Sequence, residues 1–250
     1  MTALLIVLQD LKRLARDRRG LLMTLAVPVA LTVAIGAVCG HRPGQAAPAG
    51  GFDAMSYIAP GMALFFMMLM VRQAARTIVE DTDRGVRDRL RCAPVSDIAV
   101  TAGCAASQVI LLFLQLLVLV DISSDLYKIA WGPAELVVLL CLVLAASASG
   151  WVALLVSVGR TPGRINMLGM ALTLAFGILG RSFAATIPSS PLMDALARMT
   201  PNYWGQHAFL ALALGGGLSS IARDLGALAL MGGVLWAASA FLSRRTAERR

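Results

Sequence analysis

Side chains of the types that perform acid–base or nucleophilic chemistry are few in this 250-residue chain. Ser147 and Ser149, in the run AASASG, qualify as nucleophiles by residue type, but hydrolysis also needs a base beside the serine. The two histidines, His41 and His207, lie in other segments. There is no G-x-S-x-G, H-E-x-x-H or Gly-x-x-x-x-Gly-Lys motif. We therefore expect packing roles for the serines, no enzymatic activity and no nucleotide site within this chain.

The cysteines do not form a recognisable ligand set. They are Cys39, Cys92, Cys104 and Cys141, and they show neither C-x-x-C nor paired spacing. Cys104 and Cys141 lie within apolar segments, where a thiol packs as a small hydrophobic side chain. We expect neither a disulfide framework nor a bound metal.

One block of charge stands out instead. Residues 80–96, EDTDRGVRDRLRCAPVS, carry eight charges in seventeen positions, whereas only 14% of the whole chain is charged. The block mixes acidic and basic residues, which are Glu80, Asp81, Asp83, Arg84, Arg87, Asp88, Arg89 and Arg91. Mixed charge around a few apolar residues is typical of a protein-docking surface. The alternative is a salt-bridged loop that serves no partner.

The rest of the chain is strongly apolar, with 58% hydrophobic residues. Six uncharged runs recur, at 21–39, 56–71, 98–120, 136–158, 165–180 and 225–242. A helix needs about 20 apolar residues to cross roughly 30 Å of hydrocarbon, so four runs suffice alone and the two shorter ones need flanking residues. The sequence predicts an all-α polytopic membrane protein with six transmembrane helices.

Basic residues predict the orientation of these helices. Of the 22 lysines and arginines, 17 lie in residues 1–20, 72–91, 159–164 and 244–250. Cytoplasmic segments carry such an excess, so both termini and the 72–97 and 159–164 loops are expected inside. The segment 203–217 is apolar, but a seventh crossing would move the basic C-terminus outside. We expect it to be a short helix lying in, or dipping into, the outer interface within a segment 181–217.

The helix at 3–19 is amphipathic, with leucines on one face and polar residues on the other. Lys12, Arg13 and Arg16 belong to the polar face. A basic amphipathic helix before a span lies on the membrane surface. Residues 1–20 are therefore expected to be an interfacial helix, which is either a topology anchor or also a contact for a cytoplasmic partner.

Small residues recur four apart in two of the predicted spans. The first span carries Ala26, Ala30 and Ala34 and then Gly36 and Gly40, and the fifth carries Gly169, Thr173 and Gly177. Such spacing lets helices approach closely in lipid. Packing within the bundle is one explanation, and a subunit interface or a pathway lining is the other.

Ionisable residues are scarce inside the predicted spans, although a carrier driven by protons or sodium usually needs them to relay the coupling ion. The second helix is expected to leave the bilayer near Arg72 and to continue to about Asp83, because a cation at mid-membrane is costly. Gly85 then permits a turn, a short helix follows, and Pro94 ends it. This geometry predicts a charged helical element in the cytoplasm between the second and third spans.

The run APGMALFFMMLMVRQAARTIVEDTDRGVRDRLRCAPVS resembles the signature of type-2 exporter permeases of the ATP-binding-cassette superfamily. Glu80 or Asp81, Gly85, Leu90 and Pro94 fill the places of that signature. The segment 177–217 also resembles the family's outer segment, through Pro188, Pro201 and Trp204. The likeness covers nearly the whole chain as a single permease domain, 1–250, and is greatest to the short drug- and antibiotic-resistance permeases of the daunorubicin-exporter type.

The resemblance implies that 80–96 is a coupling element seated in a groove of a separate ATPase subunit. The residues implied in coupling are Glu80, Asp81, Asp83, Arg84, Gly85, Arg89, Leu90 and Pro94. It also implies that Lys12, Arg13 and Arg16 contact that ATPase, which would hold ATP and magnesium, so this chain needs no cofactor of its own. Two permeases, as a homodimer or a related heterodimer, would pair with two ATPases in the cell's inner (plasma) membrane, without nucleic acid.

These observations predict an exporter of a lipophilic or amphipathic compound such as a drug, an antibiotic or a lipid. Export of a polysaccharide or glycolipid is the alternative within the family. A membrane scaffold that recruits a partner without transport is the alternative outside it.

Overall fold

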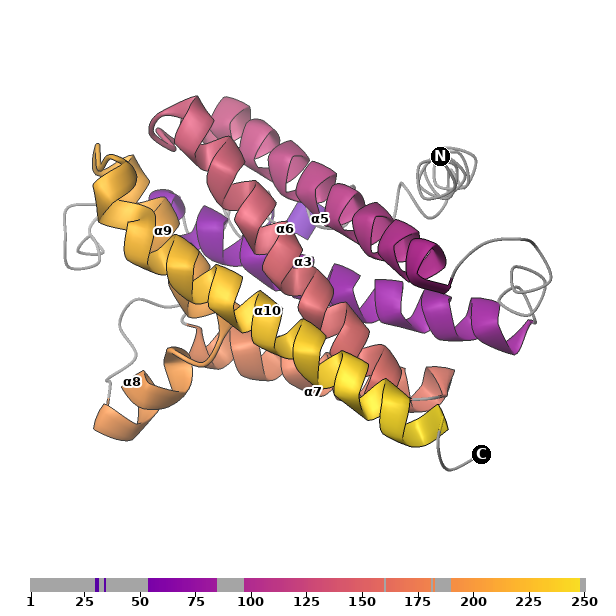
Figure 1. Ribbon diagram of the computed structural model, residues 1–250. Coiled ribbons are helices and arrows are strands. Elements are labelled where there is room, and N and C mark those ends of the chain that lie inside the picture. The colour runs from indigo at the N-terminus through magenta and orange to yellow at the C-terminus, as the bar shows by residue number, and fades with distance from the viewer. Residues whose placement is uncertain are drawn as a thin grey trace.

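The computed structural model describes residues 54–84, 97–159, 161–180, 182 and 190–247, together with 30, 31 and 34. Every regular element within these ranges is an α-helix. The helices are α3 (Ala54–Asp83), α5 (Asp97–Tyr127), α6 (Ala134–Gly159), α7 (Pro162–Leu179), α8 (Pro191–Ala197), α9 (Pro201–Ala213) and α10 (Leu218–Ala247). The long helices lie side by side as a bundle, and α8 projects from one end of it (Figure 1).

Five of the described helices are long and apolar enough to cross a membrane. They are Ser56–Asp83, Cys104–Tyr127, Ala134–Gly159, Pro162–Leu179 and Leu218–Leu242. The prediction of an all-helical protein is confirmed for the described residues, and five of the six predicted apolar runs overlap these helices. The first predicted span, 21–39, and the amphipathic helix, 1–20, fall outside the described residues, apart from helical and exposed Ala30, Leu31 and Ala34.

One helix end agrees with the sequence-based prediction and another differs from it. α3 continues through Arg72 and ends at Asp83, as predicted. α10 begins at Leu218, seven residues before the uncharged run at 225–242, and so contains Arg223 and Asp224 in its second turn. The helix accommodates both charged residues because each has a partner on α9.

The most extensive helix contact joins α6 and α10. It depends on small residues, since a Cβ on Gly232 would lie 2.9 Å from the Cα of Ser147. Trp236 of α10 donates to the Ser149 hydroxyl at 3.1 Å. Ser147 is itself buried, so both serines lie at a helix contact, in agreement with the packing roles expected of them. Lipid provides no hydrophobic force between helices, so a membrane bundle is held by the van der Waals contact that such close approach allows.

The α6–α7 connection is very short. α6 ends at Gly159, and Thr161 is the N-cap of α7. The Thr161 side chain accepts a hydrogen bond from the backbone N–H of Arg164, and Pro162 occupies the first helical position. A Cβ on Gly159 would lie 2.3 Å from Cγ1 of Ile165, so a larger residue here would force the Ile165 side chain to move. The two helices are therefore held together at this end.

α9 is a short helix built into the bundle. Its 13 residues rise about 20 Å, which is too short to cross the membrane. One face packs between α3 and α6, where a Cβ on Gly205 would lie 2.7 Å from Leu64 and 3.0 Å from Leu144. Gln206 donates to the backbone carbonyl of Tyr57 on α3 at 2.8 Å. A short helix is thus present at 201–213, which overlaps the predicted 203–217, and it packs against the long helices from one end; its place at the outer interface stays a prediction.

We predict that Gly232→Ala lowers the free energy of unfolding by about 1–3 kcal/mol, because the added methyl group meets the backbone of α6. Gly233→Ala is the matched control, since no atom lies within 4 Å of the position that its methyl group would take. This second substitution should be neutral or stabilising by up to about 1 kcal/mol. Thermal unfolding in detergent micelles measures both, and equal midpoints for the two variants would contradict the proposed contact.

Candidate functional site

The candidate site lies where α3 leaves the bundle. The last turns of α3, from Arg72 to Asp83, lie at the same end as the α6–α7 connection (Figure 1), and we call this the charged end. Of the predicted coupling residues, the structure describes Glu80, Asp81, Asp83 and Arg84. The predicted residues Gly85, Arg89, Leu90, Pro94, Lys12, Arg13, Arg16, Gly36 and Pro188 lie outside the described part of the chain.

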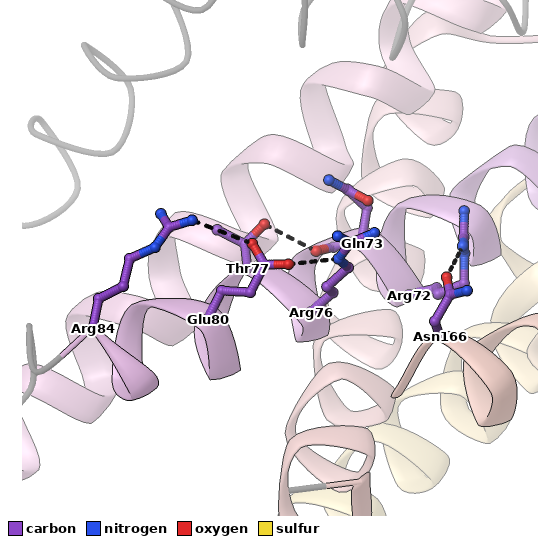
Figure 2. Close-up of polar contacts among 7 residues, drawn as sticks. All are labelled: Arg72, Gln73, Arg76, Thr77, Glu80, Arg84 and Asn166. Carbon is purple, nitrogen blue, oxygen red and sulfur yellow. Dashed lines mark hydrogen bonds and ion pairs between the residues drawn. The ribbon is translucent and has the colours of Figure 1, made fainter. Parts of the chain in front are cut away.

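Figure 2 shows that one carboxylate links two arginines along the end of α3. Arg76 donates from Nε to Oε1 of Glu80 at 2.6 Å, and the Arg84 guanidinium lies 3.9 Å from Oε2 of the same side chain. Both arginines are exposed, and exposed pairs at this spacing contribute only about 0.3–0.5 kcal/mol each. The row therefore contributes little to stability; its effect is to present ordered charge of both signs on a helix surface.

Deeper along α3, Arg72 joins this helix to α7. Its guanidinium donates from Nη1 to Oδ1 of Asn166, as Figure 2 shows. Its aliphatic stem fills the space above Gly169, where a Cβ would lie 2.5 Å from Cγ of the arginine. Arg72 Nε is buried and makes no hydrogen bond within the described structure. A polar bond and a close contact thus hold α3 and α7 together at the charged end.

The small residues of α7 therefore lie partly at a contact within the chain. Thr173 is completely buried, and its hydroxyl donates to the carbonyl of Gly169 at 2.8 Å. Gly177 is buried too, and its carbonyl accepts from Ser182 N–H at 3.0 Å. A Cβ on Gly61 of α3 would lie 1.8 Å from the Ser182 carbonyl oxygen, so the two segments also touch at the opposite end. A role of these residues, or of Ala30, in a pathway or dimer contact stays a prediction.

The outer-segment residues Pro201 and Trp204 begin α9. Thr200 caps this helix by accepting from the N–H of Tyr203 at 3.3 Å, and Pro201 takes the first helical position. Trp204 donates from Nε1 to the carbonyl of Arg198 at 2.7 Å, and its ring lies 5.7 Å from the Arg223 guanidinium carbon. Trp204 therefore connects the end of α8 with the start of α10.

The sequence reading missed one polar pair, His207 with Asp224. Nδ1 of His207 on α9 lies 2.9 Å from Oδ2 of Asp224 on α10. The sequence offered one signal: Asp224 stands directly before the apolar run at 225–242, and His207 lies on the other side of the glycines at 215–217. The pairing depends on where α10 begins, which hydropathy did not predict.

The described residues contain no group of three His, Cys, Asp or Glu side chains that could hold a metal ion. Their polar contacts join helices to one another and present charge at one end. Such an arrangement can bind a protein partner and transmit displacement between helices.

Two comparisons with known proteins agree with this geometry. A family model described as ABC-2 family transporter protein matches residues 45–241. The linearmycin resistance permease protein LnrN of Bacillus subtilis (strain 168) is 27% identical over 159 residues, which are 63% of this chain and 41% of that protein. The chain thus spans about two fifths of the length of the curated relative that it matches.

We predict that Asn166→Ala lowers the free energy of unfolding by about 1–3 kcal/mol, because the half-buried Arg72 guanidinium then lacks its partner. The neighbouring Met167→Ala is the control, since that side chain is 66% exposed and should change stability by less than about 0.5 kcal/mol. Thermal unfolding of the purified proteins in one detergent decides the comparison. A loss for Met167→Ala as large as that for Asn166→Ala would refute the role of the bond.

Proposed function

The chain belongs to the ABC-2 transporter family, and from that membership we propose that it is the membrane-spanning permease subunit of an ATP-driven exporter. The observation that carries the proposal is the family match, which extends from before α3 to the last turns of α10. Together with five long apolar helices, this match identifies a multi-pass membrane protein with a transport rather than a catalytic role.

A separate ATPase subunit is the proposed source of energy. The sequence contains no Gly-x-x-x-x-Gly-Lys loop, so it lacks the usual means of binding nucleotide phosphates. ABC-2 permeases generally work with an ATPase subunit. The ordered charges of Glu80, Arg76 and Arg84 at the charged end suit a groove lined by charges of both signs. In our proposal two permeases and two ATPases form the working complex.

The proposed orientation in the membrane is based on the distribution of basic residues. The charged end, with both termini, would face the cytoplasm, because the basic residues concentrate there. α8 and α9 would then lie on the outer side, as the outer segment 181–217. The plasma membrane is the proposed location.

The proposed mechanism uses the contacts of α3. ATP binding closes the ATPase dimer and displaces the segment 80–96, which lies at the end of α3 and beyond it. α3 carries the displacement to α7 through Arg72, Asn166 and Gly169. The bundle then shifts between two arrangements according to how well each one fits the ATPase in its two states.

The proposed substrate is a lipophilic or amphipathic compound, with an antibiotic as the first class to test. Two observations support this choice. The relative named above is a resistance permease for linearmycin. The described spans are mainly apolar, with mean hydropathies of 1.3 to 2.4, which suits a greasy molecule better than an ion.

We predict that the triple variant Glu80→Arg, Asp83→Arg and Arg89→Glu loses its ATPase partner. Reversing these charges replaces attraction with repulsion across the docking surface, and a loss of about 1.4 kcal/mol already weakens binding tenfold. The measurement is co-purification of an ATPase with the tagged permease from membranes, followed by its ATP hydrolysis.

The control reverses three exposed charges at the opposite end: Asp125→Arg, Lys128→Asp and Arg198→Glu. It should retain the ATPase fully. If no ATPase accompanies the wild-type protein, the exporter proposal fails. If the first triple variant binds the ATPase as the wild type does, the docking role of 80–96 fails while the exporter proposal stands.

A further inference from the structure

Asp224 is a buried acidic residue inside an apolar helix. It lies in the second turn of α10, within the span Leu218–Leu242, and only 2% of its side chain is exposed. Removing a carboxylate from water is costly unless a partner compensates it, so an acidic residue in a membrane helix indicates a function. Its partner is His207 of α9, at 2.9 Å. The histidine side chain is 60% exposed, so water reaches one member of the pair but not the other.

The connection between α9 and α10 is suited to bending. Leu214 is followed by Gly215, Gly216 and Gly217 before α10 begins. Gly215 has a φ of 82°, a left-handed conformation that glycine adopts without strain. No atom lies within 4 Å of a Cβ placed on Gly215 or Gly217, although the N–H groups of Gly215 and Gly216 donate to the carbonyls of Leu212 and Ala211 in the closed turn. Hinges usually consist of a few such residues at the ends of elements.

The two helices are held by different contacts, and α9 is the more buried of the two, with Phe209 and Leu212 completely buried. α10 is fixed to α6 along its length by the close contact at Gly232 and by Trp236 and Ser239. α9 is held on its buried side by neutral contacts, such as Gln206 with the Tyr57 carbonyl and the edge-on stacking of Trp131 on Phe209. Two polar contacts hold it to α10: the pair of His207 with Asp224, and the Arg223 guanidinium over the Trp204 ring. Movement of α9 about the glycines must therefore break this pair.

We infer that His207 and Asp224 form a clasp that keeps α9 closed against α10 and that its release opens the α8–α9 end of the bundle. Release exposes Asp224 to water, which replaces the histidine as its partner. Two arrangements of α9 result. In the closed one His207 and Asp224 are paired and the carboxylate is shielded from water, and in the open one they are separated and water surrounds the carboxylate. Positions of α9 between these two are disfavoured because the carboxylate would be buried without a partner. That the open arrangement releases an exported compound rests on the proposed function; the clasp itself does not.

Cys141 is a natural reporter of this opening. It is completely buried on α6, one turn from Leu144, whose side chain approaches Gly205 of α9. Movement of α9 away from α6 would let a reagent reach this thiol. Cys104 on α5 belongs to a different part of the bundle and reports general loosening instead.

The experiment measures maleimide labelling of the full-length protein in lipid nanodiscs, with the two cysteines resolved by peptide mass spectrometry. His207→Ala should label at Cys141 at least about tenfold faster than the wild type, equivalent to 1.4 kcal/mol. His207→Gln keeps a hydrogen-bond donor and should label nearly as slowly as the wild type. Arg198→Ala removes an exposed charge from the same end and should change nothing.

A double variant separates a clasp from a pair that only supports the fold. His207→Leu with Asp224→Leu replaces the pair by apolar side chains, which removes the hydrated open arrangement, so Cys141 should label more slowly than in the wild type. The inference is overturned if Cys141 reacts equally in all variants, or if Cys104 accelerates as much as Cys141. If His207→Ala does not fold, the double variant alone decides: the inference is also overturned if that variant folds and its Cys141 labels no more slowly than in the wild type.

Discussion

Helices in a membrane gain nothing from the hydrophobic effect when they exchange lipid contacts for contacts with one another. The stability of this bundle therefore depends on how closely the helix backbones approach. Gly232 of α10 rests against Ser147 of α6, and Gly61 of α3 rests against the carbonyl of Ser182. Each contact would be lost with a single added carbon. Hydrogen bonds such as the one from Trp236 to Ser149 then fix the register of helices that are already in contact.

The polar side chains are arranged in keeping with this constraint. At the charged end, Arg72 reaches across to Asn166 while its stem covers Gly169. At the α8–α9 end, Asp224 is covered by His207. The first pair connects residues 94 apart in the chain and the second connects two consecutive helices, and each places one buried polar group next to a more accessible one. Each end thus combines close contacts, which water cannot replace, with one polar bond that water can replace.

Much of this fold follows from the sequence. The apolar runs predicted the long helices, and the cost of placing Arg72 at mid-membrane predicted that α3 continues to Asp83. The start of α10 was not predictable from hydropathy, because Arg223 and Asp224 count as breaks until Trp204 and His207 are placed beside them. Likewise, the spacing of Gly169 and Thr173 predicted a close contact but not that Arg72 supplies it. Most of the first span and residues 85–96 lie outside the described part of the chain, so what the sequence indicates for them stays a prediction.

The short turn at Thr161 gives α7 the mechanics of a lever. This turn ties the beginning of α7 to α6 and acts as a fulcrum, while Arg72 touches the helix at Asn166 and Gly169. These points lie roughly 8–12 Å along the axis, whereas the 18 residues of α7 extend about 27 Å at 1.5 Å per residue. In the exporter that we propose, a sideways push from α3 near the fulcrum would be enlarged about two to three times at Leu179. Ser182, which follows the tip of α7 and touches Gly61 of α3, would have to move with it.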